Sequence, residues 1–161
     1  MPLDALAQAL QASAWSEALR ASVWLYPLVN TAHVLGIALL FGAIAPLDLR
    51  LLGVFCRVPL APLAATLVPV ATAGLLMALV SGALMFATRP LDYVAEPLFG
   101  LKLVLLAAAV FNALWLRRDS EWHRVGEASG EPPPRRWRWH GLLSLLLWLG
   151  VITAGRLIGY R

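Results

Sequence analysis

Four long apolar segments are the feature of this sequence that most restricts its fold. An α-helix needs about 20 predominantly apolar residues to cross about 30 Å of hydrocarbon. Four segments of that length lie at roughly 22–46, 63–87, 98–116 and 139–159. Because 60% of the 161 residues are hydrophobic and only 14% are charged, their apolar surface exceeds what a soluble core of this size could bury. The sequence therefore predicts an all-α integral membrane protein, a four-helix bundle.

Residues 1–21 precede this four-helix domain, which we assign to residues 22–161. Within residues 3–20, leucine and alanine recur among glutamine, serine and glutamate, so we expect an amphipathic helix that lies in the membrane interface. A signal peptide is the alternative, but the segment has no basic start and no continuous apolar centre. After the third span, residues 119–134 have too little apolar content to pack and are expected to form a flexible polar loop.

Prolines, charges and tryptophans mark the expected ends of the spans. Pro46, Pro59 and Pro62 bracket the connection between the first two spans, because proline interrupts a helix. Asp48 and Arg50 follow the first span, where we expect them to form an ion pair at the membrane boundary. Three tryptophans are expected in the aromatic belt at that boundary: Trp24, Trp137 and Trp139.

Basic residues near the span ends predict the orientation of the bundle. Eight of the thirteen lie on the side of the first and third connections: Arg50, Arg57, Arg117, Arg118, Arg124, Arg135, Arg136 and Arg138. The other five lie on the side of the termini: Arg20, Arg89, Lys102, Arg156 and Arg161. Since positive charge concentrates in cytoplasmic loops, both termini are expected to face away from the cytoplasm. Membrane topology also explains these arginines better than nucleic-acid binding does, so we expect no nucleic-acid partner.

Small residues on the second span could permit close packing of helices. In lipid the hydrophobic effect contributes little between helices, so close approach through small side chains matters more. Gly74, Ala78 and Gly82 recur at four-residue spacing in this span. Four alanines of the third span could likewise bring two backbones close: Ala107, Ala108, Ala109 and Ala113. We call Gly74, Ala78 and Gly82 the small-residue ridge. The ridge either contacts another helix or merely reflects the high frequency of glycine and alanine in membrane helices.

His33 is the residue most informative about function, because it lies about eleven residues into the first span and roughly 16 Å deep. Tyr26, Asn30 and His33 fall at positions i, i+4 and i+7, so they share one helix face, which Ile37 and Leu40 continue. We expect that face to point into the bundle. An ionisable group at this depth usually marks a cofactor, a proton path or an ion site. The alternative is a neutral imidazole that is hydrogen-bonded within the fold.

Two cations are expected above His33 on the side of the termini. Lys102 lies about one turn into the third span, and Arg156 lies near the end of the fourth. Along the membrane normal, both lie about 6–10 Å from the level of His33. At that separation they could pair with the carboxylates of a porphyrin whose iron binds His33. Each could instead anchor its helix at the interface. Met77 lies near the same level and is a candidate second axial ligand, although methionine is more often a packing residue.

The other groups that could bind metal are scattered. His140 is expected near the membrane boundary, about 10 Å from the level of His33, with a hydrogen bond at the interface, and His123 is expected to be solvated. Cys56 is the sole cysteine, so it can form neither an intramolecular disulfide nor a cysteine cluster. The sequence has no phosphate loop, no dinucleotide-binding fingerprint and no paired histidines at i and i+4.

The segment TAHVLG around His33, together with LKL around Lys102, resembles a group of small bacterial four-span membrane proteins. The group comprises relatives of the HemJ-type protoporphyrinogen oxidases and the CopD copper-resistance proteins, and the resemblance covers roughly residues 22–118. It implies a b-type haem in the membrane and functional roles for His33 and Lys102. Where HemJ-type proteins tend to carry histidines, just before the lysine and near the end of the third span, this chain has Gly100 and Asn112.

Together these features predict a bacterial inner-membrane protein that binds haem b or a related porphyrin through His33, with both termini in the periplasm. Its role would be electron transfer or tetrapyrrole chemistry, and the sequence does not decide whether it is an enzyme. One alternative is a non-catalytic membrane subunit or assembly factor that contacts a partner protein or a second copy. Metal-ion handling is another. The lipid bilayer is the partner that the composition itself requires.

Overall fold

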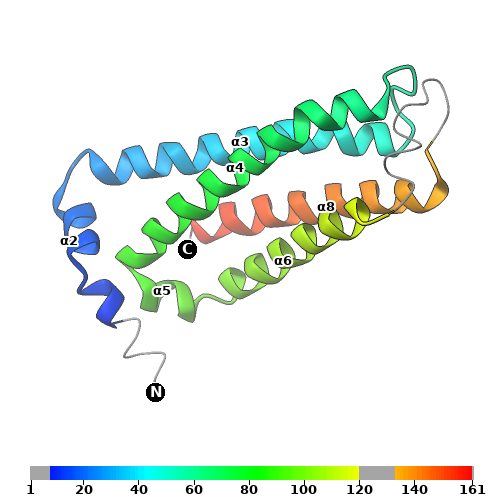
Figure 1. The fold of residues 1–161 in the computed structure, drawn as a ribbon. Coiled ribbons are helices and arrows are strands. Elements are labelled where there is room, and N and C mark those ends of the chain that lie inside the picture. The colour runs from blue at the N-terminus through cyan, green and yellow to red at the C-terminus, as the bar shows by residue number, and fades with distance from the viewer. Residues whose placement is uncertain (1–7, 120–132, 161) are drawn as a thin grey trace.

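The computed structural model describes residues 8–119 and 133–160, and these residues are all-α (Figure 1). Four of the helices are long and apolar enough to cross a membrane. This confirms the predicted all-α four-helix bundle and makes the chain a multi-pass membrane protein. The helices are α2 (Ala14–Ala21), α3 (Leu25–Leu51), α4 (Leu60–Thr88), α5 (Pro90–Ala95), α6 (Pro97–Arg117) and α8 (Arg135–Ile158).

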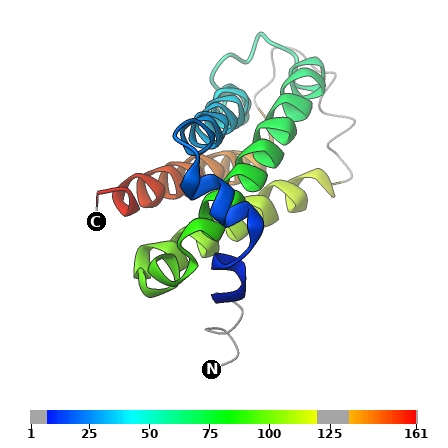
Figure 2. The same cartoon turned by 90° about the vertical axis from the view of Figure 1, so that its left-hand side faces the viewer.

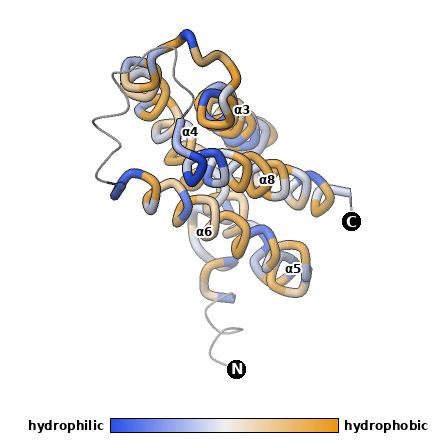
Figure 3. Tube along the Cα trace, turned by 90° about the vertical axis from the view of Figure 1, so that its right-hand side faces the viewer, coloured by the Kyte–Doolittle hydropathy of each residue, from blue (hydrophilic) through white to orange (hydrophobic). Residues whose placement is uncertain are grey.

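The four long helices are arranged as two antiparallel pairs (Figures 1 and 2). Helix α3 packs most extensively on α4, and α6 packs on α8. The two pairs meet mainly through α3 and α8, whereas the backbones of α4 and α6 lie farther apart. Hydrophobic residues predominate along the long helices, and strongly hydrophilic residues gather at the start of α8 (Figure 3). Large apolar side chains such as Val104 and Phe111 are exposed on the outside, as is expected of surfaces that face lipid.

Two groups of buried side chains hold the bundle together. Leu40, Ala109, Trp148 and Val151 form the central core where α3, α6 and α8 meet. A second core, formed by Leu51, Leu60, Leu116 and Trp137, lies toward the connections. Because Ala109 is completely buried, its small side chain lets the α6 backbone come close to its neighbours.

Trp137 does not belong to an aromatic belt, and that prediction is wrong. Its side chain is completely buried in the second core, and its indole N–H donates a hydrogen bond to Asp119 at 2.9 Å. A buried indole is stable when its one donor has a partner, and Asp119 at the end of α6 supplies it. Trp24 and Trp139 remain exposed.

The first connection is shorter than predicted, because α3 continues through Pro46 to Leu51. Proline is tolerated within a membrane helix when its surroundings satisfy the carbonyl that it leaves free. Asp48 and Arg50 therefore lie inside the helix, two residues apart and on different faces, and they form no ion pair with each other. Arg50 Nε instead donates to the carbonyl of Val58 at 2.6 Å. The expected boundary ion pair is thus wrong.

Helices α3 and α4 cross at two glycines. A Cβ built on Gly36 would lie 2.7 Å from the backbone nitrogen of Ala78, and one built on Gly74 would lie 2.5 Å from that of Leu40. Real side chains do not approach backbone atoms this closely, so both positions require glycine. The predicted ridge of Gly74, Ala78 and Gly82 is therefore a real contact, and its partner is α3 of the same chain.

The N-terminal segment is not one continuous helix in the described residues. Residues 8–11 are helical, the chain breaks at 12–13, and α2 begins at Ala14. Ser13 causes the break, since its side chain accepts a hydrogen bond from the backbone N–H of Ser16 and so acts as an N-cap. Residues 1–7 lie outside the described residues. So do residues 120–132, which make up most of the polar loop predicted at 119–134.

Helix α2 lies across the end of the bundle, where Figure 2 shows it in front of the long helices. Ser16 is completely buried and donates a hydrogen bond to the carbonyl of Ala87 at 2.8 Å. Arg20 donates to the carbonyl of Thr88 at 3.0 Å, which satisfies a free carbonyl at the C-terminal end of α4. The buried face of α2 therefore packs on protein.

Candidate functional site: a cavity at the end of the bundle near the termini

A cavity of about 1670 Å³ opens among the helices in the half of the bundle near the termini. All four long helices line it, and α2 and α5 contribute residues at its mouth. The helix face predicted from the sequence lies in its wall: Tyr26, Asn30, His33, Ile37 and Leu40. Lys102 and Arg156, the two predicted cations, line the same cavity. The structure thus brings together residues from three helices that are far apart in the sequence.

His33 is held in one orientation by α4. Its Nδ1 lies 2.9 Å from the carbonyl oxygen of Ala78 and 3.2 Å from the hydroxyl oxygen of Ser81. A carbonyl oxygen can only accept a hydrogen bond, so Nδ1 carries the proton and donates it. The Ser81 hydroxyl is itself used as a donor to the carbonyl of Met77 at 2.5 Å, which leaves its oxygen free to accept from Nδ1. Nε2 therefore has an available lone pair.

The Nε2 atom of His33 has no hydrogen-bond partner among the described residues. The ring lies against α4 at Gly82, where a built Cβ would be only 3.1 Å from Cε1. A larger residue at position 82 would therefore push the imidazole away from α4. An imidazole whose Nδ1–H is bound to a backbone carbonyl, and whose Nε2 borders an open space, has the arrangement seen in histidines that bind metals.

Lys102 lies across the cavity from His33. Its side chain passes over Gly155 of α8, where a built Cβ would be 3.4 Å from Nζ, so the lysine lies directly against α8. The half-buried ammonium group forms no hydrogen bond or ion pair with any described residue, and it lines the same cavity as His33. An unpaired ammonium inside a membrane protein is costly, so it favours an anionic occupant.

Arg156 is less available than Lys102. It is exposed, and its Nη2 donates a hydrogen bond to the hydroxyl of Tyr160 at 2.6 Å. Its guanidinium also lies 4.6 Å from the centre of the Tyr160 ring, in a cation–π contact. Since a guanidinium has five N–H donors, Arg156 can still bind a carboxylate at the mouth of the cavity.

Met77 does not line the cavity. Its side chain is partly buried elsewhere on α4 and is not among the residues that border the open space. Met85 lines the cavity instead, because it lies seven residues after Ala78 on the same face of α4. The depth of Met77 could be predicted from its position in the span, but its place outside the cavity could not.

Sequence reasoning missed the aromatic mouth of the cavity. Phe86, Tyr93 and Phe99 come from α4, α5 and α6, and their ring centres lie 5.3–5.9 Å apart. Burial raises the pKa of the Tyr93 phenol above its ordinary value, and the nearby Tyr26 raises it further. Tyr93 is therefore a neutral hydroxyl at physiological pH. The prolines that begin α5 and α6 were the available signal for this short helix.

The inner end of the cavity is apolar apart from one polar atom. Leu40, Trp148 and Val151 line it and are all buried. Nε1 of Trp148 is buried without a hydrogen-bond partner among the described residues. An unpaired buried donor costs free energy. A water molecule, or an acceptor atom of a bound ligand, would therefore stabilise the fold by accepting a hydrogen bond from this indole N–H. Sequence reasoning missed this residue, which lies four residues after the buried Ser144 on α8.

His140 serves a different part of the bundle. Its Nδ1 lies 2.7 Å from the side-chain oxygen of Asn112, and the Asn112 amide donates to the carbonyl of His140 at 3.0 Å. This reciprocal pair joins α6 to α8 within the bundle and involves no cavity residue. His123 lies outside the described residues. Residues 8–119 and 133–160 contain no cluster of three or more His, Cys, Asp or Glu side chains that could hold a metal ion.

Comparisons with known proteins found no relative of this chain. No protein-family model matches the chain. Neither the curated proteins nor the solved structures contain a significant match.

Proposed function

We propose that the cavity binds haem b or a related porphyrin, with Nε2 of His33 as an axial ligand of the iron. The observation that carries this proposal is the hydrogen bond from Nδ1 of His33 to the carbonyl of Ala78. It fixes the tautomer that leaves Nε2 unprotonated, and it orients the ring. Among the described residues that line the cavity, His33 is the only histidine.

The distribution of charge in the cavity suits a porphyrin with two carboxylates. The apolar inner end can contact the ring, while Lys102 and Arg156 at the outer end can pair with carboxylates. The aromatic residues Phe86 and Phe99 at the mouth offer flat surfaces against which a planar ligand can stack.

A bound porphyrin would supply redox or tetrapyrrole chemistry, while the protein's residues would bind and orient it and exclude water. We therefore propose a role in electron transfer or tetrapyrrole chemistry. The resemblance to HemJ-type proteins at His33 and Lys102 supports the same assignment. The location that we propose is the bacterial inner membrane, and the arginine-rich connections support an orientation in which both termini face away from the cytoplasm, into the periplasm.

The direct test is purification in mild detergent after haem-replete expression, followed by absorption spectroscopy and elemental analysis. We expect a Soret band and iron in proportion to protein. Copper or another metal without a Soret band would favour metal-ion handling instead. Neither metal nor Soret band, together with a co-purified membrane protein, would favour a non-catalytic subunit.

Replacing Lys102 with glutamine is expected to weaken haem retention without moving the Soret band. Charge-assisted hydrogen bonds contribute about 1.5–3 kcal/mol, so loss of haem to a scavenging apoprotein should become roughly 10-fold to 100-fold faster. The band should keep its position, because the His33 ligand is intact. Arg117→Gln is the matched control, since Arg117 is exposed at the other end of the bundle. Unchanged haem loss in Lys102→Gln would show that Lys102 does not bind the carboxylates.

A further inference from the structure

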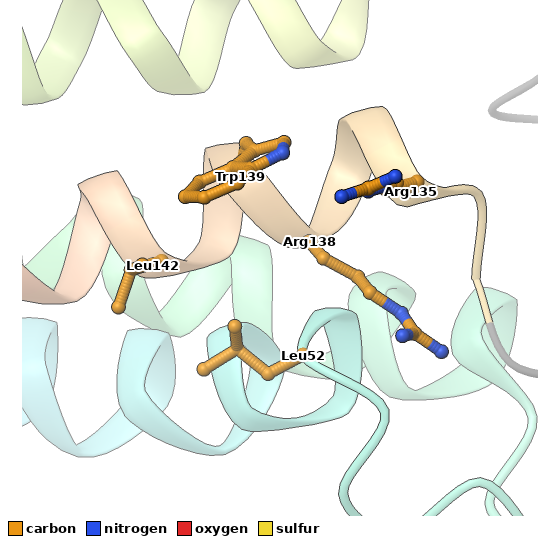
Figure 4. Close-up of a pocket in the computed structure, with 5 residues that line it drawn as sticks. All are labelled: Leu52, Arg135, Arg138, Trp139 and Leu142. Atoms are coloured by element: carbon orange, nitrogen blue, oxygen red, sulfur yellow. The ribbon is translucent and has the colours of Figure 1, made fainter.

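Two arginines at the start of α8 line a second, smaller cleft, at the opposite end of the bundle from the cavity. The cleft has a volume of about 200 Å³ and is lined by Leu52, Arg135, Arg138, Trp139 and Leu142. Figure 4 shows the two arginines on adjacent turns at one end, with the indole and the two leucines on the other side. The cleft therefore has a cationic end and an apolar end.

Neither guanidinium is neutralised by the described part of the chain. Arg135 and Arg138 are both exposed and form no hydrogen bond or ion pair with a described residue. Two acids at this end of the bundle do not pair with them: Asp119 pairs with Arg136 at 3.0 Å, and Asp48 is buried beside Ser144. As far as residues 8–119 and 133–160 are concerned, the two positive charges are thus available to an added anion.

The local backbone adds to this positive charge. Helix α8 begins after Pro134 with no side-chain cap and no acidic residue in its first turn. The N-terminal end of a helix carries partial positive charge, so arginines there are unfavourable unless an anion compensates them. Beside the cleft, Gly53 has φ +93, and a Cβ at this position would lie 3.6 Å from Nη2 of Arg138, an ordinary van der Waals distance. The guanidinium therefore lies beside the turn that ends α3.

The apolar end of the cleft distinguishes an amphiphile from a simple ion. Leu52 and Leu142 contribute apolar surface, and the exposed indole of Trp139 lies beside them. Tryptophan and arginine next to a membrane span typically lie at the level of lipid headgroups. Inorganic phosphate would contact the arginines but leave the apolar surface uncovered.

We propose that this cleft binds an anionic diacyl phospholipid, with its phosphate between Arg135 and Arg138 and the start of an acyl chain against Leu52 and Leu142. Basic clefts at the ends of membrane helices bind such headgroups through charge. This site is independent of the porphyrin proposal, because it shares no residue with the cavity.

The test measures lipid binding to the detergent-purified full chain by native mass spectrometry. Phosphatidylglycerol is titrated in, and phosphatidylcholine with the same acyl chains is titrated in parallel. In Arg135→Gln/Arg138→Gln, we expect the apparent Kd for phosphatidylglycerol to rise about 30-fold, the effect of losing two arginines beside an anionic headgroup. The matched control is Arg117→Gln/Arg118→Gln, which removes the same charge from exposed residues at the same end of the bundle.

The expected result is preference for phosphatidylglycerol over phosphatidylcholine, lost in the cleft variant and retained in the control. Equal weakening in both double variants would show that general basic charge attracts the lipid and would overturn the proposal. Equal binding of the two lipids would also overturn it. A third arm adds inorganic phosphate: displacement of the lipid by millimolar phosphate would assign the arginines to a free anion.

Discussion

Replacing His33 with alanine is expected to reduce the Soret absorbance of the purified protein at least about tenfold, because it removes the axial ligand of the iron. No other histidine among the described residues lines the cavity, so no neighbouring imidazole can take over. The protein should still fold, since His33 is only partly buried. The measurement is the ratio of Soret absorbance to protein absorbance after haem-replete expression.

His140→Ala is the matched control for this experiment. His140 is also partly buried in a long helix, but it bonds to Asn112 and contacts no cavity residue. Its replacement should leave the Soret band unchanged and affect only stability. If His33→Ala retained the wild-type band, or if both variants lost it equally, His33 would not be the ligand.

Replacing Gly74 with alanine is expected to lower the stability of the bundle by about 1–3 kcal/mol or more, which is the usual cost of overpacking. The added Cβ would lie 2.5 Å from the backbone nitrogen of Leu40 and 2.7 Å from the carbonyl oxygen of Gly36. Backbone atoms cannot turn aside as a flexible side chain can, so α3 and α4 must separate. The same separation would disturb the bond from His33 to Ala78, so haem content should fall as well.

Gly42→Ala in α3 provides the control for Gly74→Ala. A Cβ at position 42 meets no atom within 4 Å, and alanine is favoured over glycine within a helix by about 1 kcal/mol. Thermal unfolding in detergent should therefore occur at a lower temperature for Gly74→Ala but not for Gly42→Ala. Equal unfolding temperatures for the two variants would contradict the close crossing of α3 and α4.

The sequence was sufficient to predict the four spans, because their hydrophobic length is set by the thickness of the bilayer. It also predicted the face that contains Tyr26, Asn30 and His33, since helical periodicity alone determines which residues share a face. That these residues bind a porphyrin is still a prediction. That Met77 lies outside the cavity could not be predicted, because it depends on how α4 is rotated against α3 at the glycine crossing.

Other features depend on contacts between distant segments, which periodicity does not reveal. Trp137 is at the start of a membrane helix, as a belt residue would be, but Asp119, which follows α6, gives its indole a hydrogen-bond partner. Pro46 was expected to end α3, yet the surrounding helices tolerate it within the span. The unpaired Nε1 of Trp148 becomes visible only when the packing around it is known.

The most direct measurement is the nitrogen hyperfine spectrum of the haem iron in protein labelled with ¹⁵N at histidine. If Nε2 of His33 is the axial ligand, the spectrum will contain coupling to a histidine nitrogen, and this coupling will persist in His140→Ala and disappear in His33→Ala. A haem signal without histidine coupling, or coupling that disappears only in His140→Ala, would show that the iron is not bound by His33.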